Sequence, residues 1–189
     1  MMDAGAAGRR SVRVARLLFG GSVTGRTLDL ALLAGRIVLA WIFVYYGSAK
    51  LFGAFPGPGP HGLHQTAQFM AQVAHLRPGG LFALVAAVLE FGGGIAVGIG
   101  LATRFAGLAL FADMVLAMAT VTWGTGINSD TSPPGYQLNL ALAAPALVSA
   151  LVGGGAYSVD ALITRRLQRA DAGATAAPSG QDPASRSRR

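Results

Sequence analysis

The chain has 189 residues, of which 52% are hydrophobic and 12% are charged. Soluble domains carry about 25% charged residues, so half of the usual charge is missing. This composition excludes a largely disordered chain, which needs low hydrophobicity and high charge density. The absence of cysteine excludes a disulfide scaffold, an iron–sulfur protein and a thiol-redox enzyme. The composition is typical of a protein whose solvent is lipid.

The chain is also basic, with a net charge of +7 and a pI of about 11.0. Its arginines cluster before the first apolar stretch and after the last one, and no basic residue lies between Phe105 and Ala156. A nucleic-acid-binding surface would interleave basic and aromatic residues along a groove. The distribution therefore argues against nucleic acid as a partner and follows the positive-inside rule of membrane proteins.

Four stretches are apolar enough to cross a bilayer, which requires about 20 residues. They are residues 28–52, 80–101, 103–123 and 136–152. We predict an all-α fold, a four-helix transmembrane bundle over residues 23–170 that is flanked by disordered tails at residues 1–22 and 171–189. Gly94 and Gly98 in the second span form a small-xxx-small pattern, which predicts close packing of two helix backbones.

Two shorter helices are expected outside the spans. In the outer loop, residues 64–76 carry apolar residues at helical spacing after a run of glycines and prolines, which predicts a short helix on the outer surface. Ser158 is a good N-cap for a helix over residues 159–170, where leucines and an isoleucine lie opposite arginines. We expect this C-terminal amphipathic helix to lie on the anionic inner leaflet.

The charge distribution also predicts the orientation. Four spans put both termini on one side, and the arginine-rich ends assign that side to the cytoplasm. The loop that holds Arg104 is then at the inner face as well. We therefore predict a multi-pass membrane protein, in contact with membrane lipids, with both termini in the cytoplasm.

Three ionisable residues, Arg36, Glu90 and Asp113, fall near the bilayer midplane at about 1.5 Å of rise per residue. A charge at the centre of a span costs roughly 2.5–3.5 kcal/mol, so each needs a reason. We expect Arg36 to pair with the two acids, with a proton retained on one acid. The group is either a proton-bearing or ligand site, or an ion network that only fixes how the helices pack.

A second polar cluster is expected near the outer boundary. Tyr46 and Lys50 share one helix face, and Gln137 and Asn139 lie at the same level in the fourth span. An interfacial aromatic belt with a snorkelling lysine is the alternative, although amides in lipid need hydrogen-bond partners. We predict no metal site, because the three histidines all fall in the outer loop, where solvated side chains are the common case.

These residues resemble the DoxX family of small bacterial membrane proteins. The resemblance rests on Arg36, YGSAKLFG at residues 46–53, LEFGGGIAVGIGLATR at 89–104, YQLNLALAAPAL at 136–147 and GGGAYSVD at 153–160. Lys50, Glu90 and Arg104 match the family's pattern. Tyr46 and Gln137 stand where the family often has a histidine and an acid, so two titratable groups are missing near the outer face.

The resemblance implies a location in the bacterial plasma membrane and a role as an integral membrane subunit of a redox or detoxification assembly. Such an assembly would be linked to quinone or thiosulfate and would hold no covalently bound cofactor. The implied partners are a second oxidoreductase subunit, or soluble enzymes such as superoxide dismutase and a sulfurtransferase. The competing hypothesis is a non-enzymatic scaffold or small-molecule-binding protein that recruits soluble partners, and a transporter is a third. Catalysis by the chain itself is left open by the sequence.

Overall fold

The computed structural model of the chain describes residues 25–55, 57, 59–128, 130 and 132–175. Its α-helices are α2 (Gly25–Phe52), α3 (Gly62–Gln72), α4 (Gly79–Ile99), α5 (Thr103–Ala117), α6 (Gln137–Val152) and α7 (Val159–Thr175). A π-helical turn, η1 (Met118–Thr122), and a 3-10 turn, η2 (Trp123–Thr125), continue α5. No strand occurs in these described ranges, which confirms the all-α class.

The predicted tails fall mostly on residues outside the described ranges. Residues 1–22 and 176–189 are not described. α7 continues to Thr175 and thus enters the segment 171–189 that the sequence predicts as a tail.

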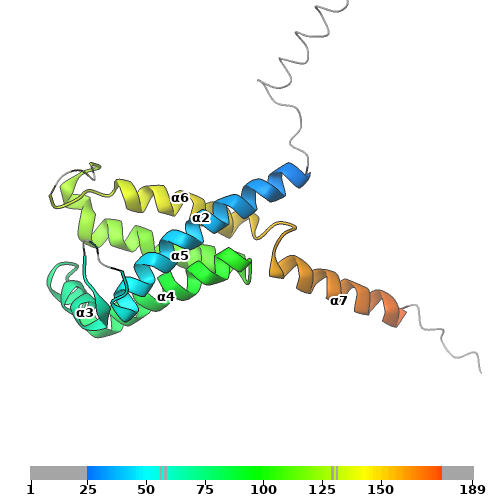
Figure 1. Cartoon of the computed structure of the whole chain (residues 1–189), viewed down its shortest axis with the longest axis horizontal. Helices are drawn as coiled ribbons and strands as arrows, with labels where there is room; N and C mark the ends of the chain where they lie inside the picture. The colour runs from blue at the N-terminus through cyan, green and yellow to red at the C-terminus, as the bar shows by residue number, and fades with distance from the viewer. Residues whose placement is uncertain (1–24, 56, 58, 129, 131, 176–189) are drawn as a thin grey trace, which may run out of the picture.

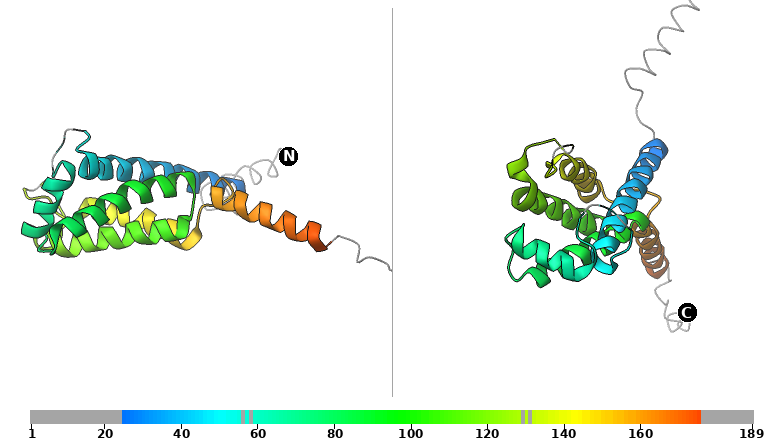
Figure 2. Two further views of the ribbon diagram at one scale, coloured as in Figure 1. Left: turned by 90° about the horizontal axis from the view of Figure 1, so that it is seen from below. Right: turned by 60° about the vertical axis from the view of Figure 1, so that its left-hand side comes forward.

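The helices α2, α4, α5 and α6 lie side by side (Figure 1). α2 packs on α4, α4 on α5, α5 on α6 and α6 on α2, while α3 covers one end of α4. α7 leaves the opposite end of this bundle and projects away from it (Figures 1 and 2). The segments Gly25–Phe52, Gly79–Ile99 and Thr103–Thr125 are long and apolar enough to cross a membrane. α6 is apolar but has only 16 residues, so the fourth span stays a prediction.

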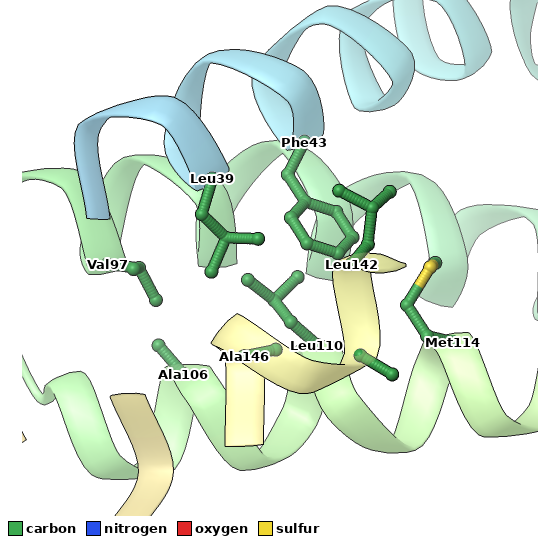
Figure 3. Close-up of a cluster of buried hydrophobic side chains, with 9 residues drawn as sticks. Leu39, Phe43, Val97, Ala106, Leu110, Met114, Leu142 and Ala146 are labelled. Atoms are coloured by element: carbon green, nitrogen blue, oxygen red, sulfur yellow. The ribbon is translucent and has the colours of Figure 1, made fainter. Parts of the chain in front are cut away.

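The centre of the bundle is a small apolar core (Figure 3). It is built from Leu39 and Phe43 of α2, Val97 of α4, Ala106, Leu110 and Met114 of α5, and Leu142, Ala143 and Ala146 of α6. Large apolar side chains also cover the outside of the helices; Trp41 is 77% exposed and Phe105 is 81% exposed. Helices that are apolar on all faces are typical of membrane spans, where the outer faces contact lipid.

Small residues bring α2 and α4 into close contact. Gly47 lies against the backbone of Glu90 and Phe91, Gly94 against Phe43 and Val44, and Gly98 against Ala40. A Cβ added at Gly94 would lie 3.0 Å from Phe43 Cβ, and one added at Gly98 would lie 2.9 Å from Ala40 Cβ. The close packing predicted for Gly94 and Gly98 is therefore confirmed.

This contact fixes the register of the two antiparallel helices. Glu90 is level with Gly47, in the half of α2 that ends at Phe52. Arg36 is level with Gly100, at the other end of α4. The two midplane charges that the sequence places at one depth thus lie far apart along the bundle.

Candidate functional site

Glu90 of α4 forms an ion pair with Lys50 of α2, and the hydrogen bond runs from Lys50 Nζ to Glu90 Oε1. The Glu90 side chain is 3% exposed and the Lys50 side chain 22%. The register explains the pair, because Gly47 faces Glu90 and Lys50 follows Gly47 by one helical turn. A carboxylate in an apolar bundle thus receives a cation from the helix that packs most closely on it.

Asp113 of α5 approaches this pair from a third helix. Its carboxyl group interacts electrostatically with both Glu90 and Lys50. Two acids therefore share one base. Glu90 Oε2 and Asp113 Oδ2 are both buried and have no hydrogen-bond partner. A buried polar atom without a partner costs about 1–3 kcal/mol and marks a place for a ligand, a water molecule or a proton.

A cavity of about 450 Å³ lies beside this group, between α3, α4 and the end of α5. We call it the Lys50–Glu90 cavity. Its apolar wall includes Phe69, Met70, Phe82, Val85, Leu89 and Leu116, and its polar members include Tyr46, Lys50, Glu90, Asp113, Thr122 and Asn139. Small-molecule sites are typically clefts of about 300–1,000 Å³ with an apolar lining and a few polar groups. The Lys50–Glu90 cavity has this size and composition.

The π-helical turn η1 forms part of the cavity wall through Thr120, Val121 and Thr122. Such turns are rare and occur frequently at functional sites. The Thr122 hydroxyl is buried without a hydrogen-bond partner, like the two carboxylate oxygens. Of the four such side-chain atoms among the described residues, three belong to residues of this cavity. Thr122 is not predicted from the sequence, because composition carries no signal for a π-helical turn.

The structure brings together members of both polar clusters predicted from the sequence, without Arg36 and Gln137. Tyr46, Lys50 and Asn139, expected near the outer boundary, line the same cavity as Glu90 and Asp113. A smaller chamber of about 120 Å³ on the bundle side is lined by Tyr46, Lys50, Glu90 and Asn139 as well. Gln137 is exposed at the start of α6 and lines neither space.

The expected pairing of Arg36 with Glu90 is wrong. Arg36 is 2% exposed and donates hydrogen bonds to Tyr157 O at 2.7 Å and to Val97 O at 3.4 Å. The reason is distance along α2, since Arg36 precedes Lys50 by about 21 Å of helix. Arg36 therefore belongs to a different cluster, at the end of the bundle where α7 begins.

We call that cluster the Arg36 junction; it contains Arg36, Asp160 and the turn between α4 and α5. The Asp160 carboxylate accepts hydrogen bonds from Ala102 N at 2.7 Å, Thr103 N at 2.9 Å and Thr103 Oγ1 at 2.8 Å. It caps the N-terminus of α5, while Arg36 binds a carbonyl of the last turn of α4, so each charge opposes a helix dipole. Burial raises the pKa of the Asp160 carboxyl, but these hydrogen bonds and the Arg36 charge outweigh it and hold the pKa below its ordinary value.

Two further sequence predictions concern this end of the bundle. Ser158 Oγ accepts a hydrogen bond from Ala161 N at 3.1 Å, which confirms Ser158 as the N-cap of α7. Arg104 is exposed and lies beside Gly153, in a groove separate from the Lys50–Glu90 cavity.

Within the described part of the chain, no three acidic or histidine side chains gather in a way that could hold a metal ion.

We predict that Asp160→Asn destabilises the protein by about 1–3 kcal/mol, because the amide lacks the charge that three donors now satisfy. Folding lowers the pKa of Asp160, so its ionised carboxylate adds to the free energy of unfolding. This stabilisation is fully present above the unfolded pKa of about 3.9 and is lost as the pH falls through the folded pKa. In detergent, the variant should unfold at a lower temperature than the wild type at neutral pH, and the difference between the two unfolding temperatures should narrow below about pH 4.

The matched control for this prediction is Asp130→Asn, in an exposed turn, which should leave the unfolding temperature unchanged. A gap of constant size at every pH would contradict the assignment of the Asp160 charge.

Comparison with known proteins adds the family. The DoxX family model matches residues 31–123, which span Arg36, Lys50, Glu90 and Asp113. Over 140 residues the chain is 31% identical to a protein of Escherichia coli (strain K12) named inner membrane protein YqjF, with 73% of this chain and 95% of that protein covered. No solved structure matches the chain significantly. A match over nearly the whole length of this relative, together with the family model and the long apolar helices, shows that the chain is a membrane protein of the DoxX family.

Proposed function

We propose that the chain is an integral membrane subunit of a redox or detoxification assembly and that the Lys50–Glu90 cavity binds a quinone. One observation carries the proposal: three buried polar atoms without protein partners belong to residues of one mainly apolar cavity of about 450 Å³. A quinone combines an apolar ring and tail with two carbonyl oxygens. It also reaches the protein through the membrane.

The polar residues suit the chemistry of a quinone. A lysine ammonium has three donors, and Glu90 uses one of them, so Lys50 can donate to a ring carbonyl. Reduction of a quinone to a quinol takes up two electrons and two protons. In our proposal Glu90 and Asp113 each take up a proton from water and pass it to a ring oxygen, and a partner subunit supplies the two electrons.

The same charges argue against thiosulfate as the ligand of this cavity. Two carboxyl groups face a single ammonium, so a dianion would enter an apolar space that offers it no net positive charge. We therefore propose that this chain binds the quinone of such an assembly. A partner subunit would oxidise the anionic donor, such as thiosulfate.

A non-enzymatic scaffold is the second candidate function, and α7 is the observation that favours it. This helix projects from the bundle, with Leu162 56% exposed and Leu167 61% exposed. Arg165, Arg166 and Arg169 lie on the same helix. Such a surface could recruit soluble enzymes such as superoxide dismutase or a sulfurtransferase without any ligand in the cavity.

We further propose that the protein crosses the plasma membrane four times with both termini in the cytoplasm. α6 completes the ring of helices although it spans only about 24 Å, and the relative from Escherichia coli is named as an inner membrane protein. The arginine-rich α7 and Arg104 then lie on the cytoplasmic side, as the positive-inside rule predicts.

The cavity proposal is tested by quinone binding in detergent or nanodiscs. A short-chain quinone should raise the unfolding temperature of the wild-type protein. Glu90→Gln and Asp113→Asn should each weaken binding about tenfold, which is about 1.4 kcal/mol. Asp130→Asn is the matched control, because it makes the same carboxyl-to-amide change outside the cavity.

Equal binding by the wild type and both cavity variants would refute the quinone site. If no quinone binds, and soluble redox enzymes are retained through α7, the scaffold function is the correct one.

The topology is tested by cysteine labelling, because the chain has no cysteine of its own. Asp130→Cys should react with a membrane-impermeant maleimide on intact cells, since its turn is assigned to the outer side. Arg165→Cys should react only after the cells are permeabilised. The opposite labelling pattern, or labelling of both sites from one side, would overturn the four-span topology.

A further inference from the structure

A groove lies at the end of the bundle that is remote from the Lys50–Glu90 cavity, and neither function above uses it. It has a volume of about 430 Å³ and is lined by the start of α5, the glycine loop that follows α6 and the first turns of α7. Its polar members include Thr103, Arg104, Ser158, Asp160 and Thr164.

Arg104 is the cation of this groove. It is exposed and makes no ion pair with any other described residue. Gly153 has a φ of +86°, and a Cβ added there would lie 3.3 Å from Arg104 Nε. Glycine at this position therefore allows the arginine side chain to lie directly along the loop.

Asp160 is the acid of this groove, and both of its carboxylate oxygens already accept hydrogen bonds. The donors are Ala102 and Thr103, at the N-terminus of α5. Its charge is also partly offset by Arg36. Arg104 is thus left without an anion of its own.

The rim of the groove carries exposed apolar side chains. Phe105 is 81% exposed and lines the groove next to Arg104. Val152 and Ile163, also in the lining, are 48% and 45% exposed. A cation thus lies directly beside exposed apolar side chains.

A second groove of about 560 Å³, on α7 near its root, repeats this pairing of cation and apolar surface. It is lined by Arg165 together with Ile99, Tyr157 and Leu162. The base of α7 therefore presents arginines beside exposed apolar side chains in two grooves.

We propose that the Arg104 groove binds the phosphate headgroup of an anionic phospholipid, with its acyl chains against Phe105 and Val152. Arginine binds phosphate with two parallel hydrogen bonds, which suits a headgroup held at one fixed place. A zwitterionic lipid would bring an ammonium group close to Arg104, so an anionic lipid is favoured. The bound lipid fills the space between the bundle and α7 and supports the root of that helix. This inference does not depend on the quinone proposal.

The test uses the full chain in detergent, with phosphatidylglycerol and phosphatidylcholine added in separate titrations. Phosphatidylglycerol should raise the unfolding temperature and stay bound in native mass spectra, and phosphatidylcholine should do neither. Arg104→Gln should weaken phosphatidylglycerol binding about fivefold, the effect of one arginine near an anionic surface. Arg77→Gln, an exposed arginine at the other end of the bundle, should bind like the wild type.

Three outcomes would overturn the proposal: equal effects of the two lipids, unchanged binding by Arg104→Gln, or the same stabilisation by glycerol phosphate alone. The last result would mean that the groove takes a free phosphate anion. If Arg104→Gln does not fold, Arg104→Lys replaces it and should show intermediate binding, because lysine keeps the charge but loses the paired geometry.

Discussion

The close contact of α2 with α4 decides which charges of this protein meet. Gly47, Gly94 and Gly98 bring the two backbones close together: a Cβ at Gly47 or Gly98 would collide with the facing helix, and one at Gly94 would be tightly crowded by it. Close-packed helices of this kind cannot slide past one another by a turn without clashes. The glycines thereby place Lys50 beside Glu90. Without that lysine, Glu90 would be a buried, unpaired carboxylate, a loss of about 3–5 kcal/mol.

The same register places one group of charged residues at the helix ends of the Arg36 junction and another group beside the Lys50–Glu90 cavity. At the Arg36 junction, Arg36 and Asp160 are hydrogen-bonded to the end of α4, the start of α5 and the loop before α7. Among the described side-chain atoms of these two residues, only Arg36 Nε is buried without a partner. In the Lys50–Glu90 cavity, each carboxyl keeps a buried oxygen without a partner, next to an apolar space. A site that can accept a ligand is thus held in place by helix packing, while the opposite end of the bundle fixes the root of α7.

Local patterns in the sequence were sufficient for part of this structure. Hydropathy predicts the helical class and the three long apolar helices, and the glycine spacing predicts the contact at Gly94 and Gly98. Helical rise gives the depth of a residue, but it does not give the level at which two helices cross, so depth alone pairs Arg36 with the wrong residue. The η1 turn and the capping of α5 by Asp160 could not be predicted either, because one lacks a compositional signal and the other joins residues far apart in the chain.

Chemical cross-linking of α2 to α4 tests this register most directly, in a chain that has no cysteine of its own. Lys50→Cys combined with Glu90→Cys should be joined by a short bifunctional thiol reagent, because the two native side chains form an ion pair. Arg36→Cys combined with Glu90→Cys should not, since Arg36 precedes Lys50 by about 21 Å along α2. That second pair would face each other if Arg36 were level with Glu90. Cross-linking of the second pair in preference to the first would contradict the account.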